Sequence, residues 1–327
     1  MEGNDAEHWL RTLPSPGAVK PLRFWVIGDP GTGGDGTGRA ERVRDGYLNS
    51  PLFRHADGWL MLGDNAYGVG ADSEYQSAVF ETYRKLLPNT PLWSTIGNHE
   101  TYTPSIPYFD IFTFPTAGEA GGLASGTERY YSFDFGNVHF ICLDSMTSSR
   151  APGSPMLNWL DADLASTNQR WLIAFWHHPP YSHASHDSDY EFELIEMRAN
   201  VVPILESHGV DLVLAGHSHS YERSYLIDGH YGSSSTLQTS MIKDDGDGRA
   251  DGDGAYGKPA LPHAGAVYTV CGVSGQASGG ALDHPVMFKS LSMLGSLLLD
   301  VDGDRLDAHF IDSTGAERDH FTINKTP

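Results

Sequence analysis

The sequence predicts an α/β fold, with a mixed β-sheet in one domain, from three observations. Short β-rich segments alternate with helical patterns from about residue 22, which is typical of strands joined by crossover helices. After residue 223 the pattern changes to hairpins. The chain has 327 residues, and its hydrophobic content of 39% is normal for a globular protein, so it can bury a sizeable core.

The first half of the chain supplies the alternating elements. Each expected strand is a short apolar run, and each expected helix shows the longer helical periodicity. In chain order, we expect a strand at 22–28, a helix at 37–49, a strand at 58–63, a helix at 72–87 and a strand at 91–97. A hairpin follows over 129–145, because Gly136 and Asn137 form a turn signal between two apolar runs.

The second half continues the alternation and then loses it. We expect a helix at 155–166, a strand at 171–176, a helix at 189–207 and a strand at 210–216. Hairpin-type segments follow at 265–276, 296–313 and 318–324, and the second contains an Asp-Gly turn.

Two segments stand apart from this domain of residues 21–327. Residues 1–20 are expected to form a polar N-terminal arm. Residues 243–258 form an acidic insert of aspartates and glycines, which suggests a calcium loop. The insert departs from the EF-hand pattern, because Arg249 occupies a ligand position and no glutamate closes the loop. A solvated acidic loop is therefore favoured over a Ca²⁺ site.

The charge balance limits the possible partners. Lys and Arg total 21 against 42 for Asp and Glu, a net charge of −21, which argues against nucleic-acid binding. An anionic substrate therefore needs a local positive centre, which bound metal cations can supply. No apolar run is long enough for a membrane helix, and the N-terminus shows no signal-peptide pattern, so we expect a cytoplasmic protein or a form whose signal has been removed. Cys142 and Cys271 lie in apolar runs and are expected to be buried free thiols.

Residue types that bind metals follow five of the expected strands. They are Asp29, Asp64 with Tyr67, Asn98 with His99, His177 with His178, and His217 with His219. In open α/β sheets, the loops at the carboxyl ends of the strands converge on one crevice. A single histidine predicts little, because most histidines are packing or surface residues, but five such groups in the same position relative to their strands indicate a metal site.

The donor types predict two ions. Carboxylate and phenolate oxygens are anionic donors, whereas imidazole nitrogens and amide oxygens are neutral, so the set divides into a more anionic and a more neutral pocket, with one aspartate shared. Two ions about 3.5–4 Å apart can hold a hydroxide and clamp a phosphoryl group during in-line displacement. His217 and His219 point the same way from an extended segment, so each can serve a different ion.

With these residues in place, the chain resembles the calcineurin-like metallophosphoesterases, and among them the purple acid phosphatases. The family's five blocks are GDxG, GDxxY, GNHE or GNHD, VxxH and GHxH. They appear here in order as Gly28-Asp29-Pro30-Gly31, Gly63-Asp64-Asn65-Ala66-Tyr67, Gly97-Asn98-His99-Glu100, Ala174-Phe175-Trp176-His177 and Gly216-His217-Ser218-His219. Ala174 replaces the family's valine, a packing change that should not affect ligation.

The resemblance implies a ligand set for each ion. Asp29, Asp64, Tyr67 and His219 would hold Fe(III), and Asp64, Asn98, His177 and His217 would hold Zn, Fe(II) or Mn(II). Most metallophosphoesterases have a histidine where Gly31 stands, so Tyr67 would supply the missing ligand and, as a phenolate on Fe(III), the family's purple colour.

The resemblance also assigns roles to His99 and His186, and the geometry of an extended chain bears on His178. His99 matches the residue that contacts phosphate and assists the leaving group. His186 matches a substrate-side histidine of some members, with His183 as a competitor and an ordinary loop residue as the other reading. His178 is expected to pack beside the ligands, because only one side of an extended chain faces the metals.

The resemblance implies a four-layer α/β/β/α metallophosphoesterase sandwich with two mixed β-sheets, in a compact form without the N-terminal β-domain of the large plant enzymes. The implied function is hydrolysis of small phosphomonoesters by a metal-held hydroxide, with Asp64, His99 and His186 as catalytic residues. The alternatives are a phosphodiesterase or nucleotide hydrolase with the same centre and, more remotely, a non-catalytic metal-binding protein of this fold. Family members are commonly exported, so a periplasmic or secreted location is also expected.

Overall fold

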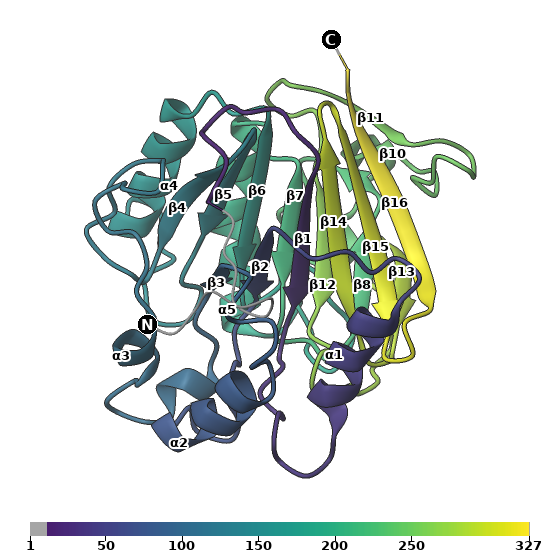
Figure 1. The fold of residues 1–327 in the computed structure, drawn as a ribbon. Coiled ribbons are helices and arrows are strands. Elements are labelled where there is room, and N and C mark those ends of the chain that lie inside the picture. Colours follow the sequence, from purple (N-terminus) through teal and green to yellow (C-terminus); the bar gives the residue numbers. More distant parts are fainter. Residues whose placement is uncertain (1–11, 327) are drawn as a thin grey trace.

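A computed structural model describes residues 12–326 of the chain (Figure 1). Residues 1–11 of the predicted N-terminal arm lie outside the described residues. The centre of the molecule consists of two seven-stranded sheets. The first contains, in spatial order, β11 (Tyr256–Pro259), β16 (Glu317–Thr326), β15 (Arg305–Asp312), β14 (Gly295–Asp302), β1 (Leu22–Ile27), β2 (Gly58–Met61) and β3 (Leu92–Ser94).

The second sheet has the same number of strands. In spatial order they are β13 (Met287–Leu291), β8 (Tyr221–Ser224), β12 (Val267–Cys271), β7 (Leu212–Ala215), β6 (Trp171–Trp176), β5 (Val138–Cys142) and β4 (Tyr131–Phe135). Both sheets are mixed, because parallel pairs such as β1 with β2 and β6 with β7 occur beside antiparallel pairs such as β1 with β14 and β4 with β5. A small sheet pairs β9 (Leu226–Ile227) with β10 (Ile242–Asp244).

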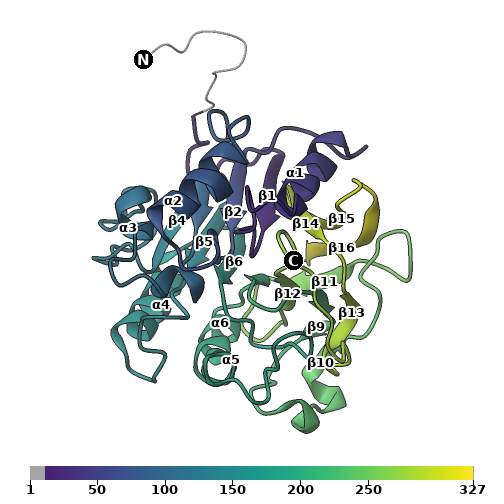
Figure 2. The same cartoon turned by 90° about the horizontal axis from the view of Figure 1, so that it is seen from below.

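The helices are short and cover the outer faces. The α-helices are α1 (Arg39–Asn49), α2 (Asp72–Tyr75), α3 (Tyr108–Ile111), α4 (Pro155–Ser166), α5 (Phe192–Glu196) and α6 (Val202–Ser207). Short 3-10 turns lie at His99–Thr101, Ser234–Thr236 and Thr239–Met241. In the view from below, α1 and α2 lie on one side of the sheets, and α5 and α6 lie on the other (Figure 2). None of the described helices combines the length and apolar character that crossing a bilayer requires.

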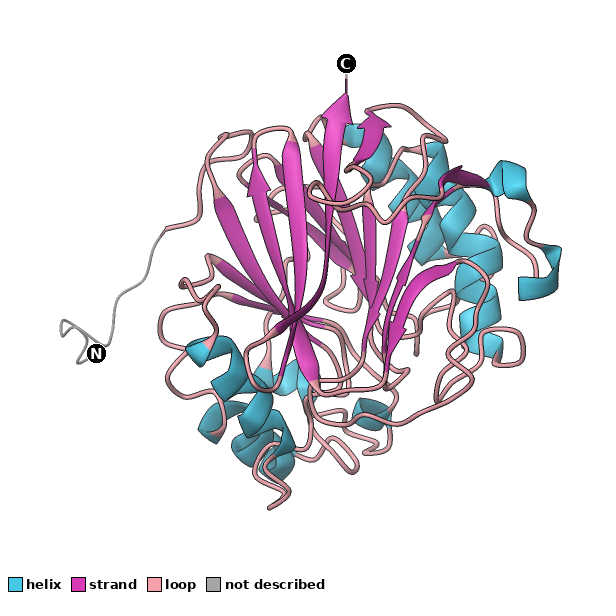
Figure 3. Ribbon diagram, turned by 90° about the vertical axis from the view of Figure 1, so that its right-hand side faces the viewer, coloured by secondary structure: helices cyan, strands magenta, loops and turns pink. Residues whose placement is uncertain are grey.

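Alternate residues of the strands face different layers, which is how the sequence builds the sandwich. Phe24 of β1 points between the sheets, where its ring lies 5.1 Å from that of Phe135 and 4.8 Å from that of Phe140. Trp25, the next residue, points outward and stacks on Tyr47 of α1 at 4.7 Å. The predicted four-layer α/β/β/α sandwich with two mixed sheets is therefore confirmed (Figure 3).

Two predicted helices are shorter and less regular than expected. The segment predicted at 72–87 is α2 followed by a π-helical turn, Gln76–Glu81, because the Thr82 hydroxyl and amide both donate to the Ser77 carbonyl. The segment predicted at 189–207 begins only at Phe192 and widens into a π-helical turn, Met197–Val201, ahead of Pro203, which has no N–H to donate.

The acidic insert, residues 243–258, comprises the end of β10, the loop that follows it and most of β11. Its aspartates bind the loop's own backbone: Asp253 accepts from the Asp247 amide at 2.9 Å, and Asp247 accepts from the Arg249 amide at 2.8 Å. The loop is mostly exposed, and the Arg249 side chain pairs with Asp251 at 3.1 Å.

A buried ion pair joins the two sheets shortly after the Gly216 turn, where β8 lies against β16. Arg223 of β8 donates to Asp319 of β16 from Nε at 2.7 Å and from Nη2 at 3.0 Å, and the Tyr221 hydroxyl donates to the same carboxylate at 2.8 Å. The Tyr221 ring stacks on Phe310 at 4.1 Å. Sequence analysis did not predict β8, because its charged residues find their partners outside the strand: Arg223 pairs with Asp319 of the other sheet, and Glu222 accepts from the hydroxyls of Ser182 and Ser220.

Replacing Asp319 by alanine is expected to destabilise the protein, because Arg223 would stay buried without its counter-ion. The expected loss in the free energy of unfolding is about 3–5 kcal/mol, measured by urea denaturation. Asp304→Ala is the matched control, since Asp304 pairs with Arg170 at an exposed position and should cost less than about 1 kcal/mol. Equal losses in the two variants would contradict the structural role given to the buried pair.

Candidate metal centre

The carboxyl ends of five strands, taken from both sheets, lie at one edge of the molecule. In the first sheet, the parallel strands β1, β2 and β3 end just before the segments that carry their ligand-type residues, and in the second sheet β6 and β7 do the same. The residues brought together are Asp29, Asp64, Tyr67, Asn98, His99, His177, His217 and His219. The expected convergence of the five strand ends is therefore present, with three strands from one sheet and two from the other.

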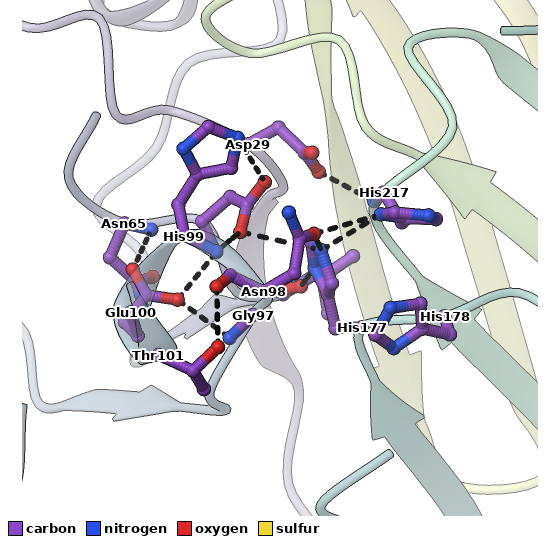
Figure 4. A network of polar contacts seen from close by, with 12 residues as sticks. Asp29, Asn65, Gly97, Asn98, His99, Glu100, Thr101, His177, His178 and His217 are labelled. Atoms are coloured by element: carbon purple, nitrogen blue, oxygen red, sulfur yellow. Dashed lines mark hydrogen bonds and ion pairs between the residues drawn. The ribbon is translucent and has the colours of Figure 1, made fainter. Parts of the chain in front are cut away.

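One group of donor atoms gathers around Asn98 (Figure 4). The Asn98 Oδ1 atom lies 3.0 Å from His177 Nε2 and 3.1 Å from His217 Nδ1, and these two nitrogens are 3.2 Å apart. Asp64 Oδ1 lies 3.4 Å from His177 Nε2. Donors about 2.0–2.2 Å from a common ion stand about 3.0–3.5 Å from one another, so these four atoms have the spacing of a coordination shell.

The hydrogen bonds of the two imidazoles show that a cation fits this group. His177 Nδ1 lies 2.8 Å from the Leu62 carbonyl and therefore carries a ring proton, so Nε2 is the nitrogen that can present a lone pair. Burial alone would lower the pKa of His177, but the carboxylates of Asp64 and Asp29 raise it, so a metal ion here would take the place of a proton. His217 Nε2 lies 3.3 Å from the Glu191 carboxylate, which leaves a lone pair on Nδ1. Burial lowers the pKa of His217 to about 3, so its ring is neutral. Two nitrogen lone pairs and the Asn98 oxygen thus face one another, an arrangement that a cation stabilises.

The second group contains Asp29, Tyr67 and His219. Tyr67 Oη lies 3.3 Å from Asp29 Oδ2 and 3.4 Å from His219 Nε2, and the last two atoms are 3.5 Å apart. Burial, followed by the nearby carboxylates of Asp29 and Asp64, raises the pKa of Tyr67 well above its usual value. The hydroxyl therefore keeps its proton unless a cation replaces it, as a highly charged ion would.

Asp64 stands between the two groups. Ligand atoms of Asp29, Asp64 and His177 all lie within 4.8 Å of one another, and these three side chains are almost completely buried. Burial and the charge of Asp29 raise the pKa of Asp64. The pKa of Asp29 is lowered instead: burial alone would raise it, but the hydrogen bond to His219 and the charges of the surrounding histidines together outweigh that effect. Two buried carboxylates this close require positive charge between them.

Three of the ligand-type residues have left-handed backbone conformations. The φ angles are 56° for Asp29, 52° for Asp64 and 65° for His217. Non-glycine residues rarely adopt such values, and each costs about 1–2 kcal/mol. The conformation turns each chain sharply at the strand end and directs the side chain toward the neighbouring strand ends.

Glycines at the strand ends leave room for these carboxylates. A Cβ atom on Gly97 would lie 2.3 Å from Asp64 Oδ1, and one on Gly216 would lie 2.6 Å from Asp29 Oδ1. Both distances are far below any normal contact. The glycines of the family blocks are therefore required by the close approach of backbone to ligand.

Glu100 holds the backbone around Asp64 in place, a role that sequence analysis did not assign. Its buried carboxylate accepts from the amides of Gly97 at 2.6 Å, Asn65 at 2.7 Å and Asp64 at 3.0 Å (Figure 4). Burial raises its pKa to about 7. The only sequence feature that could have pointed to this role is the place of Glu100 in the Gly97-Asn98-His99-Glu100 block. Sequence spacing does not reveal which backbone amides the carboxylate faces.

Tyr102 and Glu191 were also missed. The Tyr102 hydroxyl accepts from Asn98 Nδ2 at 2.9 Å, which orients the Asn98 amide with Oδ1 toward the histidines. Glu191 lies against both His217 and His186, with Oε2 2.9 Å from His186 Nδ1. Neither residue belongs to a family block, and each acts by orienting a residue that donates directly.

The remaining predicted histidines lie at different distances from the centre. His99 is at the rim, where Nε2 lies 3.9 Å from Asp64 Oδ2 and Nδ1 contacts the Gly68 carbonyl at 2.7 Å. The His186 ring packs on that of His217 with 3.7 Å between centroids, whereas His183 contacts Asp283 instead, away from these residues. His178 is buried beside His217 and bonded to Ser145 at 2.9 Å, so it packs next to the donors.

Comparison with known proteins agrees with this geometry. Residues 22–221 match the family model described as calcineurin-like phosphoesterase. The chain is 31% identical to purple acid phosphatase 18 of Arabidopsis thaliana, over 69% of this chain and 49% of that protein. It is 30% identical to purple acid phosphatase 1 of Ipomoea batatas, over 68% of this chain and 47% of that protein. The chain thus spans about half the length of the curated relatives it matches.

Structural comparison leads to the same fold. The structure of purple acid phosphatase PPD1 from seeds of yellow lupin (Lupinus luteus) superposes with a TM-score of 0.70 and 19% sequence identity. The match covers 97% of this chain and 56% of that chain. At this identity, the likeness establishes a shared fold, and the candidate centre stands on the donor geometry described above.

Gly97→Ala is expected to weaken metal binding, because the new methyl group would displace the Asp64 carboxylate. The dissociation constant for Zn²⁺, measured by competition with a chromophoric chelator, should rise about 10- to 100-fold. Gly279→Ala is the matched control, since no atom lies within 4 Å of the added methyl group there. Unchanged Zn²⁺ affinity in Gly97→Ala would show that Asp64 does not bind the ion from this position.

Proposed function

The chain belongs to the calcineurin-like phosphoesterase family, and from this premise we propose that it is a dinuclear metal-dependent hydrolase of small phosphomonoesters, similar to purple acid phosphatases. One observation carries the proposal. Two groups of donor atoms, one more anionic and one more neutral, lie on either side of Asp64 with the spacing of coordination shells.

Each group would hold one ion. Asp29, Tyr67 and His219, together with Asp64, would bind a trivalent ion, because anionic oxygen donors favour high charge. Asp64 would also complete the second group, with Asn98, His177 and His217, whose mostly neutral donors suit Zn, Fe(II) or Mn(II). When bound, such a pair supplies the positive charge that a phosphoryl group needs and lowers the pKa of a bound water.

The surface charge supports a small substrate. The chain carries a net charge of −21, so the field around the protein repels anions except at the centre itself. A polynucleotide would meet that repulsion along its whole length, whereas a small phosphomonoester presents its charge only where the ions compensate it.

His99 is the candidate proton donor to the leaving group. Its Nδ1 atom is held by the Gly68 carbonyl, and the edge of its ring meets Tyr67 at 4.4 Å between centroids. These contacts point Nε2 toward Asp64 at the partly exposed rim of the centre. A phosphoryl group held beside Asp64 would therefore have its ester oxygen within reach of this nitrogen.

His186 is the candidate substrate-side histidine, and Glu191 positions it. Burial alone would raise the pKa of Glu191, but the hydrogen bonds to His186 and His217 lower it well below its usual range. The carboxylate therefore holds Nδ1 of His186 and leaves Nε2 for a phosphate oxygen. The ring of His186 is partly exposed, as a residue that contacts substrate must be.

The proposal predicts that the protein cleaves p-nitrophenyl phosphate faster than bis(p-nitrophenyl) phosphate. Asp64→Ala should reduce kcat/KM on the monoester by at least about 1,000-fold, because Asp64 serves both donor groups. The measurement is release of nitrophenol from each ester by wild type and variant.

Controls in the same assay separate a lost centre from a lost fold. Asp161→Ala changes an exposed aspartate paired with His208 and should retain full activity. Full activity in Asp64→Ala would reject the mechanism, and preferential cleavage of the diester would assign the centre to phosphodiester hydrolysis. Binding of two metals without cleavage of either ester would favour a non-catalytic role.

Tyr67→Phe tests the nature of the anionic pocket. A tyrosine phenolate bound to Fe(III) absorbs broadly in the visible range, so the purified protein should contain about two metals per chain, including iron, and be coloured. The variant should lose the band, as recorded by absorption spectroscopy with metal analysis. Iron with an unchanged band in the variant would rule out Tyr67 as the ligand.

A further inference from the structure

The side chains of the loop between β6 and α5 contact two separate groups of residues. His186 and Glu191 face the candidate metal centre, where they contact His217. His183 and Asp189, from the same loop, contact a separate cluster that contains Asp283 and His284. This outer cluster shares no residue with the two donor groups of the centre.

His183 presents a lone pair to two carboxylates. Its Nδ1 atom lies 3.2 Å from Asp283 Oδ1 and therefore carries the ring proton. The other nitrogen, Nε2, is buried without a hydrogen-bond partner, and it lies 3.5 Å from Asp187 Oδ1 and 3.7 Å from Asp189 Oδ2. Whenever the ring is neutral, the lone pair of this nitrogen faces two anionic oxygens, a contact that a cation among the three atoms would make favourable.

His284 adds a second, independent sign of a ligand. The residue is only 2% exposed, and its Nε2 atom, which carries the ring proton because Nδ1 accepts from the Val286 amide, has no acceptor, so Nδ1 is the nitrogen that can bind a cation. The ring lies 4.6 Å from that of His183 between centroids, and one nitrogen lies within 4.8 Å of ligand atoms of His183 and Asp189. Burial lowers its pKa to about 3, so the ring is neutral. Nδ1 accepts only a long hydrogen bond, 3.3 Å, from the Val286 amide.

We propose that His183, Asp189 and His284 form a mononuclear site for a divalent transition-metal ion of the Zn²⁺ type, with Asp187 as the fourth ligand. Two imidazoles and carboxylate oxygens are a common donor set for Zn²⁺. Two ligand atoms of a tetrahedral Zn²⁺ site lie about 3.4 Å apart, close to the distances from His183 Nε2 to the two aspartate oxygens. His284 would complete the site after a small movement in which the ion takes the place of the Val286 amide.

The ion would fasten the loop to the segment after β12. These segments already touch, because the Leu282 amide donates to the His183 carbonyl at 2.7 Å, and a Cβ on Gly280 would lie 2.1 Å from the Ala184 carbonyl oxygen. Asp189 is itself anchored by the Ser234 amide at 2.8 Å. A metal here would cross-link the loop that carries His186 and Glu191 to the segment after β12, and the Asp189–Ser234 hydrogen bond ties that loop to a third segment.

The experiment counts Zn²⁺ bound per chain. Wild type and His284→Gln are stripped of metal, equilibrated with excess Zn²⁺, passed through a desalting column and analysed by mass spectrometry for zinc and by amino-acid analysis for protein. We expect about three Zn²⁺ per wild-type chain and one fewer in His284→Gln, and the same loss in His183→Gln. His208→Gln, which changes a half-buried histidine paired with Asp161, should keep all three.

A second background separates this site from the dinuclear centre. In a chain carrying Asp64→Ala and His217→Ala, one Zn²⁺ should remain, and adding His284→Gln should remove it. Retention of that ion after His284→Gln, or equal zinc content in wild type, His183→Gln and His284→Gln, would overturn the proposal. Circular dichroism of each variant identifies any misfolded one, and the two single variants decide the matter independently of each other.

Discussion

The candidate centre depends on a hydrogen bond that joins the two sheets at their strand ends. Asp29 follows β1 in the first sheet, and its Oδ1 atom accepts from the backbone amide of His217, which follows β7 in the second sheet, at 2.8 Å. The other oxygen, Oδ2, faces Tyr67 and His219. One carboxylate thus sets the separation of the sheets at this edge and also contributes a donor, so the ligand geometry cannot change without moving the layers.

The backbone conformations at the centre are costly and are supported from outside it. Left-handed φ angles at Asp29, Asp64 and His217 are unfavourable for residues with a side chain. Hydrogen bonds to the Glu100 carboxylate and the close approach of Gly97 and Gly216 hold these turns. The energy needed to keep the ligands in position therefore comes from the surrounding turns.

Much of the layout could be predicted from the sequence because the signals were local. Each strand that carries a ligand is an apolar run followed by a glycine or proline turn, and parallel strands must end at a common edge, so the gathering of Asp29, Asp64 and His217 followed. The contributions of Glu100 and Tyr102 could not be predicted, because each depends on which amide it faces across a turn. The same holds for β8, where Arg223 is compatible with a buried strand only because Asp319 arrives from a strand almost a hundred residues later.

The pairing of β1 also governs the order in which the molecule can assemble. One edge of β1 pairs with β2, but the other pairs with β14, with Leu22 opposite Val301. On a ribosome, the first strand would be made long before its second neighbour, and the strand that carries Asp29 would keep an open edge until the last part of the chain emerged. Loop closure over such a distance is slow, so the first sheet, and with it four of the seven ligand-type residues, is completed late in folding.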